Sequence, residues 1–187
     1  TSMSHNEAGN YKDGDGNRVH SSFERRNQML QLGFTPTENT LLTGTYERSR
    51  GEAAYADRMM DGSKFDRDAW NVRFVQRNIT PWFTELELRY GQSKIDHVMD
   101  TYSMRYLSMM GNQVKKAMNP KRETNTGHLK ATFDWSDINL QTGIDYMRDK
   151  HLARMEMHGE GYTHKPYQPQ QNFTQWGGFA EGDRKSV

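Results

Sequence analysis

The sequence predicts an all-β protein: an antiparallel transmembrane β-barrel segment of about eight strands, part of a larger barrel. Three observations predict it. Apolar residues recur at every second position in several segments, aromatic residues lie near the ends of these segments, and short turns alternate with long polar connections. Connections that alternate in this way are typical of outer-membrane barrels, which carry short turns on one rim and long loops on the other.

The composition is unusual for a water-soluble domain. Of 187 residues, 33% are hydrophobic and 26% charged, and the mean hydropathy is −1.05. So little apolar material would hardly offset the conformational entropy of folding, yet 11% of the residues are aromatic, which disordered chains avoid. No apolar run approaches the ~18 residues of a membrane helix. The chain has no cysteine, hence no thiolate ligand, and its net charge of +1 gives no electrostatic case for nucleic acid.

Alternation with period two predicts the strands. It is clearest in residues 84–90 (TELELRY), where threonine, leucine and tyrosine alternate with glutamate and arginine, and it starts again at Leu30, Trp70, His128 and Ile138. The expected strands are residues 1–11, 20–34, 41–51, 68–78, 83–100, 123–135, 138–149 and 172–181.

The connections and the aromatic residues favour a membrane barrel over a soluble β-sandwich, which also alternates. The charged face suits a water-filled interior, and aromatic residues tip the apolar face as interfacial girdles require. These aromatic residues are Trp70, Phe83, Tyr90, Trp135, Tyr146 and Trp176. The expected short turns are residues 36–39, 78–82 and 136–137, and the expected long loops are residues 52–67, 101–122 and 150–171.

Five stretches resemble the barrel of TonB-dependent copper receptors. They are YKDGDGNRVHSSFERR (11–26), GEAAYADRMMDGSKFDRD (51–68), DHVMDTYSMR (96–105), YMRDKHLARMEM (146–157) and WGGFAE (176–181). The resemblance implies a 22-stranded barrel in the outer membrane of Gram-negative bacteria, gated by an N-terminal plug and energised by the TonB complex. We therefore expect residues 1–187 to be a partial barrel domain whose plug domain lies outside this chain.

His97 and Met99 are the expected metal ligands. Parity along residues 83–100 places both on the face of Glu85, Glu87 and Arg89, which we expect to line the lumen, about 7 Å apart along the strand. His97 lies thirteen residues beyond Thr84, near the turn. At ~3.3 Å per residue and a strand tilt of ~45°, it stands about 30 Å above Thr84, at the outer edge of the hydrocarbon layer. Thioether sulfur favours Cu(I), and imidazole accepts copper in either oxidation state. Together with the resemblance, this predicts copper as the transported substrate, with further ligands from the plug or from loop methionines and with no catalytic cofactor.

Seven further residues are candidate auxiliary ligands in the long loops. They could collect copper transiently, although methionines of this kind also pack flexibly against neighbouring loops. They are Met59, Met60, Met109, Met110, Met155, Met157 and His158.

The predicted function is import of copper by an outer-membrane TonB-dependent receptor. The alternative is a receptor of the same architecture for a siderophore or another metal chelate. The expected partners are copper, the TonB complex and outer-membrane lipid.

Two other motifs are given simpler interpretations. Residues 13–24 match a calcium loop at four positions, but Arg18 replaces the required glycine, which favours a Gly/Asp-rich turn. Ser22 and His20 lack an evident orienting acid, so we do not expect an enzyme.

Overall fold

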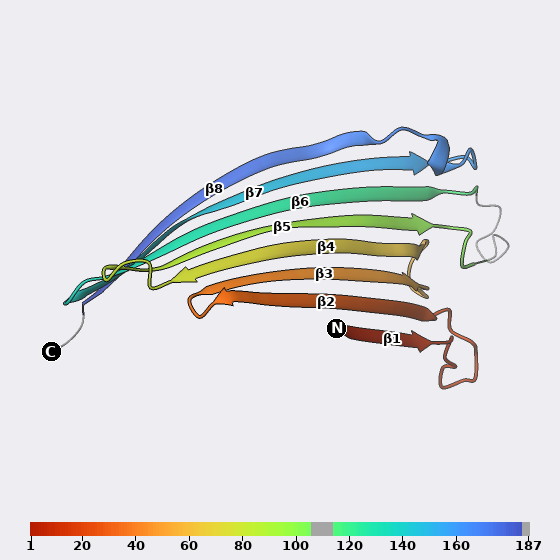
Figure 1. Ribbon diagram of the computed structural model, residues 1–187. Helices are drawn as coiled ribbons and strands as arrows, with labels where there is room; N and C mark the ends of the chain where they lie inside the picture. The colour runs from red at the N-terminus through yellow and green to blue at the C-terminus, as the bar shows by residue number, and fades with distance from the viewer. Residues whose placement is uncertain (106–113, 185–187) are drawn as a thin grey trace.

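The computed structural model describes residues 1–105 and 114–184 as one antiparallel sheet, whose strands lie side by side in chain order (Figure 1). The fold class expected from the sequence is therefore confirmed. The strands are β1 (Ser2–Ala8), β2 (Phe23–Thr37), β3 (Thr40–Ala53), β4 (Asp61–Arg77), β5 (Phe83–Asp100), β6 (Ala117–Asp134), β7 (Ile138–Glu156) and β8 (Gln168–Arg184), with a short 3-10 helix, η2 (Tyr162–His164), before β8. Within the described residues, no helix is long and apolar enough to cross a membrane.

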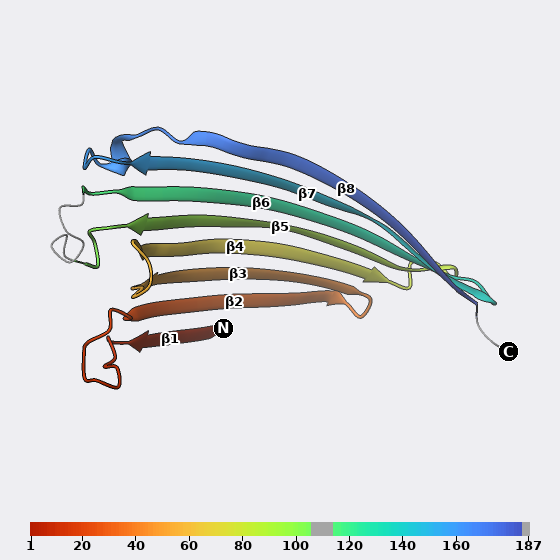
Figure 2. The same ribbon diagram turned by 180° about the vertical axis from the view of Figure 1, so that it is seen from behind.

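The two ends of the sheet differ in the length of their connections, as Figures 1 and 2 show from opposite sides. Residues 38–39, 78–82 and 135–137 form short turns at one end, hereafter the turn end. Asn78 adopts a φ of 52° there, a left-handed conformation that asparagine tolerates better than most residues. The longer connections, residues 9–22, 54–60 and 157–167 together with the described parts of the β5–β6 connection (101–105 and 114–116), lie at the opposite loop end. The predicted alternation of connection lengths is thus present.

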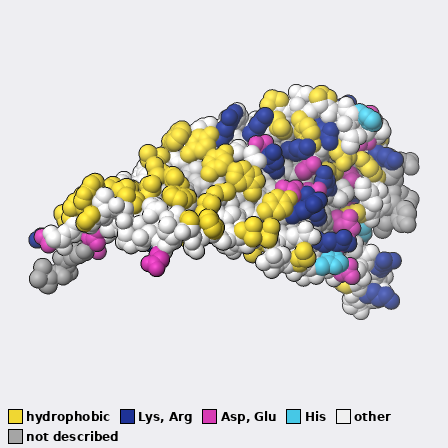
Figure 3. Space-filling view, in the orientation of Figure 1, with side chains coloured by type: hydrophobic (Ala, Val, Ile, Leu, Met, Phe, Trp, Pro, Cys, Tyr) yellow, Lys and Arg dark blue, Asp and Glu magenta, His cyan; other side chains and the backbone are white. Residues whose placement is uncertain are grey.

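One face of the sheet, hereafter the apolar face, carries an uncovered apolar surface toward the turn end (Figure 3). Strand pleating places every second side chain on it, so it includes Val72, Leu88, Leu129 and Ile144, which are 37–50% exposed. The described residues form a single sheet, and no second sheet packs against this surface. The soluble β-sandwich is therefore wrong, because a sandwich would bury these side chains between two sheets.

Aromatic side chains bound the apolar surface at both ends. Toward the turn end, the Phe83 and Phe133 rings stack at 4.9 Å, and Trp82 and Trp135 stack on Phe133 at 6.1 and 5.8 Å. Toward the loop end lies a second row, hereafter the aromatic girdle: Tyr46, Trp70, Tyr90, Tyr146 and Trp176. The Tyr46 hydroxyl donates to Asp68 Oδ1 at 3.0 Å, and Asp68 lies beyond the girdle toward the loop end.

The opposite face, hereafter the polar face, carries cross-strand ion pairs at the height of the apolar surface. Arg77 Nε lies 3.1 Å from Glu85 Oε2, and Arg73 donates to Glu87 at 2.8 Å. Glu87 is almost fully buried and also pairs with Arg89. A sheet with one apolar and one charged face has the distribution expected of a barrel wall between lipid and a wet lumen.

The strands extend further toward the loop end than the sequence predicted. β4 begins at Asp61 instead of residue 68, β6 begins at Ala117 instead of residue 123, and β7 ends at Glu156 instead of residue 149. In these extensions both faces carry polar side chains, so alternation of hydrophobicity disappears although the backbone ladder continues. The loops are correspondingly shorter than expected.

Candidate metal centre

His97 and Met99 lie near the loop end of β5, on the polar face with Glu85, Glu87 and Arg89. On the other face at this height, Asp96 pairs with Lys64 of β4 at 2.9 Å, and the next outward residue of β5, Val98, is buried. His97 is seven residues beyond Tyr90 of the girdle, or roughly 23 Å along the strand. The sequence predicted that His97 lies at the outer edge of the hydrocarbon layer. Because the apolar surface ends at the girdle, His97 instead lies well outside that edge, toward the loop end.

The His97 ring has an unusual environment for a polar group. It packs against the ring of Phe65, directly opposite on β4, with 4.4 Å between ring centroids. Its Nε2 atom is buried and has no hydrogen-bond partner among the described residues. A buried polar atom without a partner carries a desolvation cost, and a bound metal ion would satisfy it.

The backbone at His97 is held by a side chain. The pairs Asp96↔Lys121 and Met99↔Met118 bracket it, so the same register places Pro120 opposite His97. Proline has no N–H for the ladder. The Asn119 side-chain amide supplies the missing donor, bonding the His97 carbonyl oxygen at 2.8 Å and Asp96 Oδ1 at 2.6 Å.

Three methionines form a row across neighbouring strands, hereafter the methionine row. Met99 lies opposite Met118 of β6, and Met118 lies opposite Met155 of β7. Directly opposed residues have Cβ atoms about 4.5–5.5 Å apart on one face, here the polar face. Met118 and Met155 are 45% and 49% exposed, so their thioethers are accessible. The row therefore places three soft sulfur donors at the level of Met99, two residues along β5 from His97.

Met118 was missed by the sequence analysis, which began this strand at residue 123. Pro120 and Asn119 interrupt the strand pattern there, because proline is rare inside a sheet. The usable signal was parity: counting back from His128 in steps of two places Met118 on the polar face.

The other candidates occupy several positions at the loop end. Met155 is in strand β7, not in a loop, whereas Met157 and His158 follow in the connection to β8. Met59 and Met60 lie in the β3–β4 connection, and Met59 is well exposed. Met109 and Met110 lie outside the described residues. The structure thus brings His97, Met99 and Met155 together through Met118, and among the described candidates no strand pairing joins Met59, Met60, Met157 or His158 to them.

A hollow of about 560 Å³ adjoins His97 across β1–β5. Its lining includes Asn6, Arg25, Phe65, Ile95 and His97. Within the described part of the chain, no group of three or more His, Cys, Asp or Glu side chains could hold a metal ion. The described residues nearest His97 offer instead the three thioethers of the methionine row.

Asp61 joins three loops at the loop end. Arg105 donates through Nε to Asp61 Oδ2 at 2.8 Å and through its terminal nitrogens to the carbonyls of Tyr55 and Arg58. The same carboxylate lies 2.8 Å from His20 Nε2. The fold thus supplies the acid that the sequence did not reveal beside His20, but that acid is bound to Arg105 at the centre of a structural cluster.

Two further polar interactions stabilise the loops at this end, one at Tyr102 and one at Asp13. Tyr102 donates to Glu156 at 3.2 Å, and burial together with this carboxylate raises the pKa of Tyr102, so its phenol stays protonated. In the Gly/Asp-rich turn, Asp13 Oδ1 accepts from the backbone N–H groups of Asp15 and Asn17 at 3.0 and 2.8 Å. These bonds are those of an Asx turn.

Comparisons with known proteins bear on the fold. No family model and no curated protein matches the chain. A solved structure, "Copper transporter OprC", matches with a TM-score of 0.86 and 33% sequence identity over 96% of this chain. The chain is similar to the copper transporter OprC. It spans 29% of that protein's length, so the eight-stranded sheet corresponds to a segment of OprC.

Proposed function

We propose that this chain is part of an outer-membrane TonB-dependent receptor that imports copper in Gram-negative bacteria. The similarity to the copper transporter OprC supports the substrate. The uncovered apolar surface between two aromatic rows supports the membrane location. β1 and β8 are the edges of the sheet and would continue into further strands of a larger barrel.

The observation that carries this proposal is the unpartnered Nε2 of His97 beside the methionine row. Imidazole and thioether together favour copper, since sulfur of this kind is a poor ligand for magnesium, calcium or iron in oxygen-rich sites. His97 and Met99 are the proposed ligands at the extracellular mouth of the lumen, and the plug would supply others.

The position of the remaining methionines suggests a direction of entry. Met59, Met60, Met157 and His158 lie at the loop end, which is extracellular in barrels with this pattern of connections. Copper arriving there would meet the methionine row before His97, which lies two residues further from the loop end on β5. The TonB complex, acting through the plug, would release the ion inward.

The test uses the full-length receptor loaded anaerobically with Cu(I) and assayed for metal content by mass spectrometry. We expect the H97A/M99A variant to lose stoichiometric copper. Met147→Ala is the matched control, because Met147 faces the same side of β7 but lies eight residues from Met155. Wild-type copper content in H97A/M99A would refute the ligand assignment.

Competition distinguishes copper import from the uptake of a metal chelate. Binding of Cu(I) should be unaffected by an excess of a ferric siderophore. Displacement of copper by the chelate, or tight binding of the chelate to H97A/M99A, would favour the chelate receptor.

A further inference from the structure

The apolar face changes character beyond the aromatic girdle, where charged side chains replace the apolar surface (Figure 3). Side chains on the outward positions of β3–β7 between the girdle and the loops form what we call the basic field. Counted over the first three outward positions beyond the girdle on each strand, its basic members outnumber its acidic ones by seven to five: Arg48, Arg50, Lys64, Lys94, Lys121, Arg148 and Lys150 against Glu52, Asp66, Asp68, Asp96 and Glu123.

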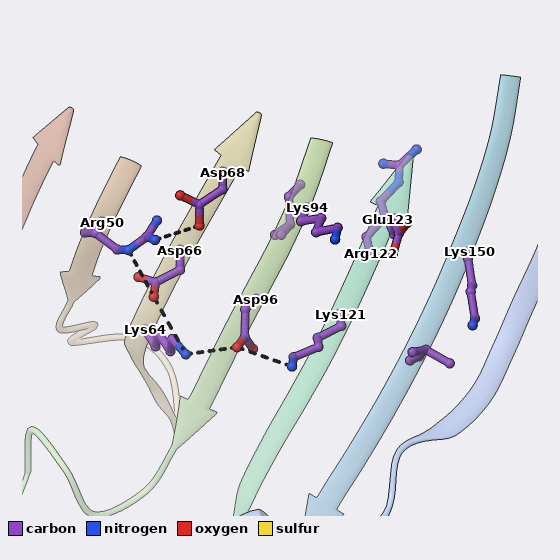
Figure 4. A pocket seen from close by; sticks show the side chains of 12 residues that line it. Arg50, Lys64, Asp66, Asp68, Lys94, Asp96, Lys121, Arg122, Glu123 and Lys150 are labelled. Carbon is purple, nitrogen blue, oxygen red and sulfur yellow. Dashed lines mark hydrogen bonds and ion pairs between the residues drawn. The ribbon is translucent and has the colours of Figure 1, made fainter. Parts of the chain in front are cut away.

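Four of the five acidic members, all except Glu52 near the end of β3, are already engaged. Arg50 pairs with Asp68 at 2.6 Å and with Asp66 at 3.3 Å. Asp96 lies between two lysines, 2.9 Å from Lys64 and 3.7 Å from Lys121 (Figure 4). Glu123 accepts a hydrogen bond from Gln92 at 3.0 Å. The ion pairs therefore use three of the seven cations.

The other four cations, Arg48, Lys94, Arg148 and Lys150, are exposed, and their side chains form no hydrogen bond or ion pair with any described residue. Figure 4 shows Lys94 and Lys150 without a partner beside a hollow of about 430 Å³. Opposed pairing links these two lysines through Glu123 of β6. The field thus presents uncommitted positive charge around a concave surface.

These cations follow the girdle directly along the strands. Arg48 and Arg148 are two residues beyond Tyr46 and Tyr146, which places them about 7 Å from the aromatic residues along the strand. Lys94 is four residues beyond Tyr90. Girdle aromatics mark the level of lipid head groups, so the basic field lies just outside the hydrocarbon, on the side that faces lipid.

We propose that the basic field binds the phosphate groups of phosphorylated glycolipid head groups in the outer leaflet. This rests on the proposed outer-membrane location but is independent of copper capture. The surplus positive charge of the basic field complements the negative charge of lipid phosphates. The lipid molecules that surround a barrel lie directly against this part of the outward face, which leaves no room there for a soluble protein.

The test measures bisphosphorylated lipid A retained by the full-length receptor in phosphatidylcholine nanodiscs, using quantitative mass spectrometry. We expect K94Q/K150Q to reduce retention by about fivefold per charge, with dephosphorylated lipid A bound weakly by all variants. K12Q/R18Q is the control of equal charge, because Lys12 and Arg18 lie in an exposed loop outside the field. K94R/K150R should restore retention if the double glutamine variant folds poorly.

Equal losses in K94Q/K150Q and K12Q/R18Q would overturn the proposal by showing a non-specific charge effect. Unchanged retention in K94Q/K150Q, or a change of oligomeric state in place of lipid loss, would overturn it as well. Copper content serves as a separate readout, because failure of the lipid site should leave copper binding intact.

Discussion

At the scale of single residues, a proline and an asparagine shape the candidate copper ligand. Pro120 removes a ladder donor opposite His97, and Asn119 replaces that donor from its side chain. The His97 backbone is thereby fixed while its Nε2 atom stays without a partner. A ligand held in place by its backbone requires less reorganisation when the metal arrives.

Met118 is the residue whose role the fold adds, and Met118→Leu tests it. Leucine conserves the volume, so it should cost less than about 1.5 kcal/mol of stability while removing the sulfur. We expect Cu(I) affinity to fall about tenfold, the low end of the effect of removing a supporting group at a metal site. Competition titration with a Cu(I) chelator measures this change, with Met147→Leu as the control. Equal Cu(I) affinities of Met118→Leu and the wild type would show that Met118 does not bind copper.

At the scale of elements, the sequence located strands well where one face is apolar. The predicted bounds of β5, residues 83–100, match the structure, because Leu86, Leu88 and Tyr90 alternate with charged residues. The first residues of β4, DGSKFDRD, gave no such signal, because neither face is apolar there. Cross-strand ion pairs such as Lys64–Asp96 accompany that extension, and a single sequence does not reveal which charges will be opposed.

The loop cluster at Asp61 could not be predicted for the same reason. His20, Asp61 and Arg105 are separated by about forty residues each and meet only through the register of four strands. His97 and Met99, by contrast, followed from parity within one strand. A local pattern thus predicted that the two proposed ligands share one face, whereas the groups that surround them depend on strand pairing.

Asp61→Asn should loosen the loop end without unfolding the sheet. Asp61 is fully buried and the Arg105 side chain is 9% exposed, so removing one partner leaves a poorly compensated charge and costs about 3 kcal/mol. Hydrogen exchange should accelerate in residues 54–60 and 101–105, while the turn end of β4 and β5 stays protected. Asp13→Asn, in an exposed turn, is the control. Unchanged exchange in both loops would mean that Asp61 does not hold them.

At the scale of the whole molecule, the sheet has two unpaired edges and one uncovered apolar face. β1 and β8 pair on one side only within the described residues, and the apolar face exposes large side chains such as Leu88 and Ile144. Unpaired edge strands and contiguous exposed apolar surfaces promote association between chains. We therefore expect the isolated 187-residue chain to sediment after refolding in detergent-free buffer.

Detergent provides the contrasting condition. Micelles above the critical concentration should cover the apolar face and keep the chain in solution with a β-type far-UV circular dichroism spectrum. The open edges remain in either medium, so some oligomers should persist in detergent. A monodisperse, soluble monomer without detergent, as judged by analytical ultracentrifugation, would contradict the barrel-wall assignment, because the apolar face would then have to be covered within the chain itself.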